Sequence, residues 1–267
     1  MNVVRGVSPP SGEQHENRHG AHRAVVTEEG ATLRHYSVGD VDVIDGFDER
    51  EWAPSVRGQV LAPWPNRLDG GRYTFEGKDG KAALNEPTLQ NAIHGLVRWL
   101  PWKTSSKSID EVTLACVLHP QPGYPWQLDL QVGYRLDGRG LTVSMLARNA
   151  SDVPAPFGIG FHPYLTVPAS RVSCGKPMVS ARAVLATPDG GWRVTVWVDA
   201  SFTNFMIYTG DTVGDTLRRR CAVAIEPMTC PPNAFRSGTD LLRIAPDAFV
   251  EGRWGLAPEL SGNLLRE

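Results

Sequence analysis

Two neighbouring stretches of strict alternation between apolar and polar residues constrain the fold of this chain more than any other feature. From Gln127 every second residue is apolar, and after a turn sequence at Asp137–Gly140 the alternation resumes: Leu128, Leu130, Val132, Tyr134 and Leu136, then Leu141, Val143, Met145 and Ala147. A period of two turns one face of a strand inward and the other outward. The pattern therefore predicts two antiparallel strands within Gln127–Arg148, buried on one face.

Further β-prone runs follow the same pattern along the chain, at Ala24–Val26, Thr32–Tyr36, Val41–Ile44, Arg72–Phe75, Val112–Leu118, Arg193–Val198, Asn204–Tyr208 and Ala222–Ile225. The 27 glycines and 21 prolines are spread among them and indicate frequent turns. No amphipathic helix of ten or more residues and no internal repeat is evident. These features predict an all-β fold, a large antiparallel β sandwich with few or no helices. The strand pattern alone does not distinguish a sandwich from a barrel.

The first 22 residues are polar and contain Pro9, Pro10, Gly12 and Gly20. We expect residues 1–22 to form a disordered tail and residues 23–267 to form a single β-sandwich domain. His15, His19 and His22 have a spacing that could hold a metal ion, but the composition of the tail argues against a metal site.

Charge and cysteine usage exclude several classes of function. A net charge of −2 and the absence of a basic stripe give no reason to expect binding to nucleic acid or to an anionic membrane. The short cluster Arg218–Arg220 is interpreted as a solvated turn. No stretch approaches the ~20 apolar residues that span a bilayer. The four cysteines have no metal-type spacing, which favours reduced thiols in a cytoplasmic protein.

Four segments are poorly explained by packing alone: Leu61–Arg67, Asn91–Trp99, Phe157–Tyr164 and Ile225–Phe235. Each, taken singly, has a plain structural interpretation. His94 stands beside a glycine, and His162 is framed by glycines that allow close backbone approach to a ligand and by aromatic rings that suit a sugar. Glu226 ends an apolar strand, where burial would raise the pKa of its carboxyl group toward that of a general base.

Together the four segments resemble the aldose 1-epimerase (galactose mutarotase) family in the strings APWPNR at Ala62–Arg67, NAIHG at Asn91–Gly95, GFHPY at Gly160–Tyr164 and EPMTCPPNAF at Glu226–Phe235. The resemblance runs from about Val60 to about Ile244. It implies a large antiparallel β sandwich and the interconversion of the α and β anomers of a hexose.

The resemblance also implies the site. Glu226 would be the catalytic base and His162 the catalytic acid. His94, Arg67 and its neighbour Asn66 would bind the sugar. Opening a cyclic hemiacetal needs an acid and a base but no cofactor and no metal. The expected partner is a small sugar such as glucose or galactose, bound by a monomer or a homodimer. One feature departs from the family, because a sugar-binding aspartate is not found in the shortened segment Val167–Trp192, where Asp189 lies in a turn-like sequence.

Three alternatives stay open. His94, His162 and Glu226 could form a facial triad for iron or manganese, although they are spread widely along the sequence. The protein could bind carbohydrate with little turnover because of the shortened segment. It could also be an epimerase for hexose phosphates, in which case Arg98 and Lys103 are candidates for holding the phosphate.

Overall fold

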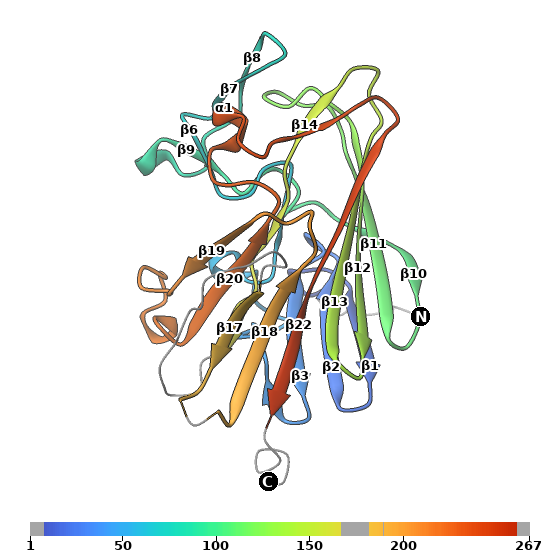
Figure 1. Cartoon of the computed structure of the whole chain (residues 1–267), viewed down its shortest axis with the longest axis vertical. Coiled ribbons are helices and arrows are strands. Elements are labelled where there is room, and N and C mark those ends of the chain that lie inside the picture. Colours follow the sequence, from blue (N-terminus) through green and yellow to red (C-terminus); the bar gives the residue numbers. More distant parts are fainter. Residues whose placement is uncertain (1–7, 167–181, 189, 261–267) are drawn as a thin grey trace, which may run out of the picture.

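The largest sheet of the protein has seven antiparallel strands in the order β10-β11-β12-β13-β22-β18-β17 (Figure 1). The computed structural model describes residues 8–166, 182–188 and 190–260. The strands are β10 Lys103–Lys107, β11 Glu111–Leu118, β12 Leu128–Asp137, β13 Gly140–Asn149, β17 Arg182–Ala186, β18 Trp192–Val198 and β22 Phe249–Leu260. The predicted hairpin is confirmed, since β12 and β13 pair without interruption from Leu128–Asn149 to Asp137–Gly140.

A second sheet is formed by the N-terminal strands β1 Gln14–His19, β2 His22–Thr27, β3 Leu33–Val38 and β4 Val41–Asp42. The expectation of a disordered tail is therefore wrong from Gln14 onward. Alternate residues of β1 are buried although they are polar, and the side chain of Asn17 donates a hydrogen bond to the carbonyl of Tyr134 in β12, at 3.0 Å. A strand whose buried polar side chains are hydrogen-bonded in this way has the composition of a disordered tail but the contacts of a sheet strand.

A third sheet has the order β16-β20-β15-β5, and β19 pairs with β20 from Ala224 to Met228, along the edge opposite to β15 and β16. Its strands are β5 Val60–Leu61, β15 Gly160–Phe161, β16 Tyr164–Thr166, β19 Asn204–Tyr208 and β20 Ala222–Met228. Every residue of β20 is buried. Glu226 lies inside this strand rather than at its end, because the strand continues through Pro227 to Met228.

Three two-stranded sheets and four short helices complete the described chain, and the small sheets extend from one end of the molecule (Figure 1). The pairs are β6 Arg67–Asp69 with β9 Asn91–Ile93, β7 Arg72–Phe75 with β8 Lys78–Lys81, and β14 Ala155–Phe157 with β21 Leu242–Ile244. The helices are the 3-10 turns η1 Pro54–Val56, η2 Pro87–Leu89 and η3 Thr216–Arg218 and the four-residue α1 Ala234–Ser237. The prediction of few helices is confirmed.

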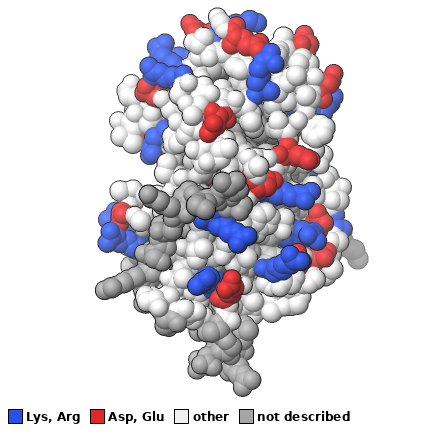
Figure 2. Space-filling model, in the orientation of Figure 1, with Lys and Arg blue, Asp and Glu red and all other residues white. Residues whose placement is uncertain are grey.

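The main hydrophobic core joins the large sheet to the other strands. Trp102, Trp192 and Trp254 are among its largest fully buried side chains. The ring of Phe161 in β15 lies 5.2 Å from that of Trp254 in β22, which links the sheet carrying the third segment to the large sheet. The sandwich architecture is thus confirmed. In the part of the chain that the structure describes, no helix has the length and apolar character needed to cross a membrane. On the face shown in Figure 2, basic and acidic side chains are interspersed.

Candidate active site

Strand pairing brings the four unusual segments into one unit. Leu61 of the first segment pairs with Gly160 of the third, and Gly160 pairs on its other side with Met228 of the fourth. The second segment joins through β9, whose Ile93 pairs with Arg67. Segments far apart in the sequence therefore meet because their backbones share sheets.

The glycines around His162 have a different purpose from the one expected. A Cβ atom at Gly160 would lie 2.8 Å from Cβ of Pro65 and 3.0 Å from Cγ of Met228. A Cβ atom at Gly158 would lie 2.4 Å from Sγ of Cys230. These glycines let the third segment pack directly against the first and the fourth. The close approach that these glycines allow is between the segments, rather than between the backbone and a ligand.

Glu226 and His162 are in direct contact at a cavity of about 320 Å³. Their side chains are 2% and 6% exposed, and Oε1 of Glu226 lies 3.3 Å from Nε2 of His162. The ring of His94 stands edge-on to that of His162 at 5.5 Å. Arg67 and Asn66 line the same cavity. The structure thus brings together all five residues singled out in the sequence.

Asn66 and His94 both have left-handed backbone conformations, with φ of 56° and 63°. Such values are uncommon for residues other than glycine and are often found at ligand sites. The amide of His94 donates to the carbonyl of Asn66 at 2.9 Å, and the Asn66 side chain accepts from the amide of Arg67 at 2.8 Å. Asn66 therefore shapes the loop that presents both Arg67 and His94.

Arg67 reaches the cavity from an ion pair at its rim. Its Nε and Nη2 atoms each donate to the carboxylate of Glu86 at 2.8 Å. The side-chain amide of Asn91 donates to the same carboxylate, also at 2.8 Å. The first residue of the second segment thus helps to hold the arginine of the first, although Glu86 itself carries no signal in the sequence.

Burial disfavours the charged forms of the central residues. It raises the pKa of Glu226 to about 8, an effect that the positive charge of Arg67 opposes. Burial lowers the pKa of His162 to about 3, and the charges of Arg57 and Arg98 act in the same direction. Burial also lowers the pKa of His94 well below its ordinary value. At neutral pH the Glu226–His162 pair therefore carries one proton, and the two groups titrate as a unit.

One oxygen of this pair is available to a ligand. Oε2 of Glu226 is buried and has no hydrogen-bond partner among the described residues. Buried polar atoms are nearly always hydrogen-bonded, and exceptions often mark functional positions. A hydroxyl group entering the cavity would satisfy this oxygen.

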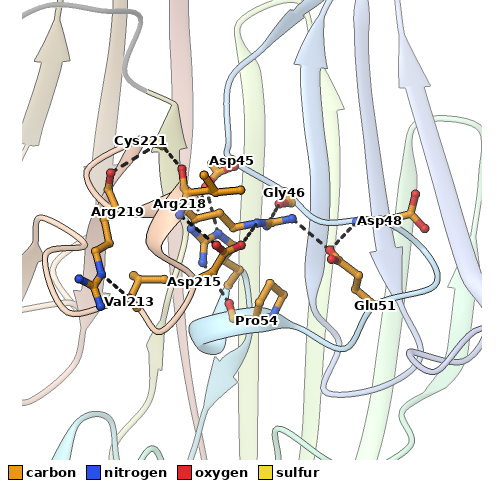
Figure 3. Close-up of polar contacts among 12 residues, drawn as sticks. Asp45, Gly46, Asp48, Glu51, Pro54, Val213, Asp215, Arg218, Arg219 and Cys221 are labelled. Carbon is orange, nitrogen blue, oxygen red and sulfur yellow. Dashed lines mark hydrogen bonds and ion pairs between the residues drawn. The ribbon is translucent and has the colours of Figure 1, made fainter.

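One further part of the cavity wall was not anticipated from the sequence. It consists of β19 residues and the loop 212–214 that follows. Figure 3 shows how the surrounding segment is held: Arg218 donates to the carbonyl of Gly46 at 3.2 Å and to Glu51 at 3.1 Å, and Arg219 donates to the carbonyl of Val213 at 2.9 Å. The cluster Arg218–Arg220 is thus more than a solvated turn, since two of its residues tie down this wall.

Several other candidates lie away from the cavity. Arg98 packs over the ring of Trp99 and does not line the cavity. Lys103 is exposed in β10 and borders a different hollow. Asp189 and residues 167–181 lie outside the described residues, as does Cys174, while Cys116, Cys221 and Cys230 are free thiols. Within the described ranges, no group of three or more His, Cys, Asp or Glu side chains is arranged to hold a metal ion.

Comparison with known proteins adds independent information. A family model described as aldose 1-epimerase matches residues 13–176. An uncharacterized Escherichia coli K12 protein, YihR, is 31% identical over 265 residues, covering 84% of this chain and 86% of its own. Bovine galactose mutarotase is 31% identical over 122 residues, covering 42% of this chain and 34% of its own.

A likeness in fold extends over nearly the whole chain. The solved structure of a galactose mutarotase-like protein from Clostridium acetobutylicum superimposes with a TM-score of 0.75 at 18% identity. The superposition covers 93% of this chain and 98% of the other. At this identity the likeness concerns the fold, which agrees with the sandwich described above.

Proposed function

Because the chain belongs to the aldose 1-epimerase family, we propose that it interconverts the α and β anomers of a hexose by acid/base ring opening and reclosure. One observation carries the proposal: a buried carboxyl group and a buried imidazole, those of Glu226 and His162, meet at 3.3 Å beside a cavity. General acid/base chemistry needs such a pair within hydrogen-bond reach of one substrate.

In the proposed reaction, Glu226 takes the proton of the C1 hydroxyl group while His162 gives a proton to the ring oxygen. The C1–O5 bond breaks, C1 becomes an aldehyde carbon, and the aldehyde turns about the C1–C2 bond. Attack of the C5 hydroxyl on the other face of the aldehyde closes the ring. The proton then returns from Glu226 to the new C1 hydroxyl, and His162 recovers its own. No atom or electron is gained or lost overall.

The charged form of the pair needs support, because burial disfavours both a carboxylate and an imidazolium. Arg67 supplies part of that support, since its positive charge lowers the pKa of Glu226. Hydroxyl groups of a bound sugar would supply the rest by donating to the free Oε2 atom. His94, held neutral by burial, would hydrogen-bond the sugar without adding charge.

Polarimetry on freshly dissolved α-D-glucose, α-D-galactose and related aldoses tests the proposal. The protein is expected to accelerate the approach to equilibrium rotation for at least one sugar. Calorimetric titration of the same sugars identifies the alternative of a binding protein. Binding of a sugar without any acceleration over the spontaneous rate would contradict catalysis and favour that alternative.

The charges that line the cavity favour a neutral sugar over a hexose phosphate. Among the lining residues that the structure describes, Arg67 is the one cationic side chain at neutral pH, and Glu86 already pairs with it. A phosphate group would be expected to need further arginine or lysine side chains. Glucose should therefore be a better substrate than glucose 6-phosphate, and the reverse order in initial rates would support the phosphate alternative.

We further propose a cytoplasmic location, which the free thiols support.

The pH dependence should report the shared proton of the pair. Loss of that proton leaves no acid, so kcat/KM should fall as pH rises through about 8, the pKa of Glu226. The rate should hold through neutral and mildly acidic pH, because burial keeps His162 from taking a second proton there. Initial rates between pH 5 and 10 test this expectation. An alkaline plateau without decline would contradict a shared proton.

Replacing Arg67 by Met should weaken substrate binding and transition-state stabilisation. A hydrogen bond to a charged group contributes about 1.5–3 kcal/mol, so kcat/KM should fall roughly 10- to 100-fold. The side chain is 46% exposed, which favours the lower part of this range. Glu86→Gln is the matched comparison, since it leaves Arg67 in place and should cost less. Equal losses in both variants would assign the effect to the ion pair rather than to the sugar contact.

A further inference from the structure

We propose that Arg57 and Tyr164 are positioning residues that fix the plane of the His162 imidazole; this inference rests on the proposed function. Neither belongs to the catalytic set inferred above. The ring of Tyr164 is stacked on that of His162, with centroids 5.0 Å apart and an interplanar angle of 18°. The guanidinium carbon of Arg57 lies 4.3 Å from the centroid of the same tyrosine ring.

Arg57 is an unusual residue for a β-sandwich interior, because it is 1% exposed. Its Nε and Nη2 atoms donate to Oδ2 of Asp45 at 3.0 and 2.8 Å, and Nη1 donates to the carbonyl of Pro54 at 3.2 Å. The Asp45 side chain is 27% exposed, so Arg57 is the buried partner, and burying a charge in this way seldom adds net stability over an apolar residue of the same volume. The presence of this ion pair next to the proposed catalytic pair is better explained by a role in positioning His162 than by a contribution to the stability of the fold.

The backbone on either side of Arg57 also holds the segment from His162 to Tyr164, which connects β15 to β16. The amide of Asp45 donates to the carbonyl of Tyr164 at 2.8 Å, and the amide of Gly58 donates to the carbonyl of His162 at 2.9 Å. The Tyr164 hydroxyl donates to the carbonyl of Ser55 at 3.1 Å. Residues 45–58 therefore hold both ends of the His162–Tyr164 segment as well as the tyrosine ring. Figure 3 shows Asp45 and Pro54, which both lie within residues 45–58.

An imidazole ring can turn about its χ2 bond, so its nitrogen faces Glu226 only if something fixes the ring plane. Nδ1 of His162 has no hydrogen-bond partner among the described residues and cannot fix it. The stack on Tyr164 supplies the missing constraint and keeps Nε2 at 3.3 Å from Glu226. The charged groups that act on His162 are Glu226, Arg57 and Arg98, and the edge of the His94 ring faces it.

The positioning role predicts a specific set of rates. Tyr164→Leu removes the stack and should lower kcat between about 10- and 100-fold, the range expected for a misplaced catalytic group. Tyr164 also lines the cavity, so KM should change too, but by less than kcat, because the contact removed is the stack on His162. Tyr164→Phe keeps the ring and should restore most of the lost kcat. A loss in Tyr164→Phe equal to that in Tyr164→Leu would overturn the stack and point to the hydroxyl instead.

Arg57 is tested by the double substitution Asp45→Asn/Arg57→Met, which leaves no unpaired buried charge. Both charges of the ion pair are removed, but of the two groups Arg57 is the one whose charge lowers the pKa of His162, so protonation of the His162 ring should move to higher pH. Nitrogen-15 NMR of the His162 ring follows this step whether or not the wild type turns over sugar. Arg148→Met is the control, because Arg148 is also an arginine held by ion pairs but lies in β13 and does not line the cavity.

The two proposals fail in distinguishable ways. A wild type without mutarotation contradicts the proposed function. The titration of the His162 ring, followed by nitrogen-15 NMR, still shows whether Arg57 acts on that ring. An upward shift in the double variant, with none in Arg148→Met, shows that Arg57 acts on His162, and a lower kcat in the same double variant supports the positioning role. An unchanged step together with unchanged kcat in folded variants overturns it.

Discussion

Glu226→Gln is expected to lower turnover by at least about 10²-fold, because an amide cannot take the C1 hydroxyl proton as a carboxylate can. Gln has the same shape and keeps a hydrogen-bonding atom near Nε2 of His162, so the pocket should stay intact. Polarimetric initial rates at saturating sugar measure the effect, and a melting curve confirms folding. A folded variant with a near-normal rate would show that the base is assigned to the wrong residue.

The same substitution should make the protein more stable at alkaline pH. Burial raises the pKa of Glu226 from 4.5 to about 8 in the folded protein, so the native state holds a proton that the unfolded chain releases. This contribution to stability is present below pH 4.5 and is lost as pH rises through about 8. Gln does not ionise, so at pH 9 the variant should melt at least about 5 °C above the wild type. A lower melting temperature would contradict a strongly desolvated carboxyl group.

His162→Asn should also reduce turnover by at least about 10²-fold, since the amide offers a hydrogen bond but no proton to the ring oxygen. Burial lowers the pKa of His162, so its neutral form contributes stability that is present above pH 6.5 and lost as pH falls toward about 3. The variant should therefore resist acid unfolding better than the wild type. Chemical denaturation at pH 4 and 7 checks the stability, and a folded, fully active variant would rule out His162 as the acid.

The sequence predicted the fold well where alternation is strong and failed where polar residues are buried. The β12–β13 hairpin lies within the predicted range, and β7 and β19 begin and end at the predicted residues. The strand β1 was missed because its inward residues are His15 and Asn17, which an apolar pattern cannot detect. The end of β20 was placed too early because Pro227 continues the strand.

The five candidate site residues do meet at one cavity, which the sequence suggested only through four framing segments taken together. Their individual roles remain predictions. Arg57, Glu86 and the wall near residues 212–214 could not be foreseen, because their importance arises from contacts made across long sequence separations. Arg57 appears in the sequence as an ordinary charged residue, and only the fold places its guanidinium over Tyr164 beside His162.

Saturation-transfer NMR at anomeric equilibrium tests the central claim most directly. Irradiating the α-anomeric proton of galactose or glucose should reduce the intensity of the β-anomeric proton when the wild-type protein is present, because the enzyme exchanges the two forms faster than the protons relax. Glu226→Gln at the same concentration should leave the β signal unchanged. Absence of transfer with the wild type for every aldose that it binds, or equal transfer with both proteins, would contradict anomer interconversion by the Glu226–His162 pair.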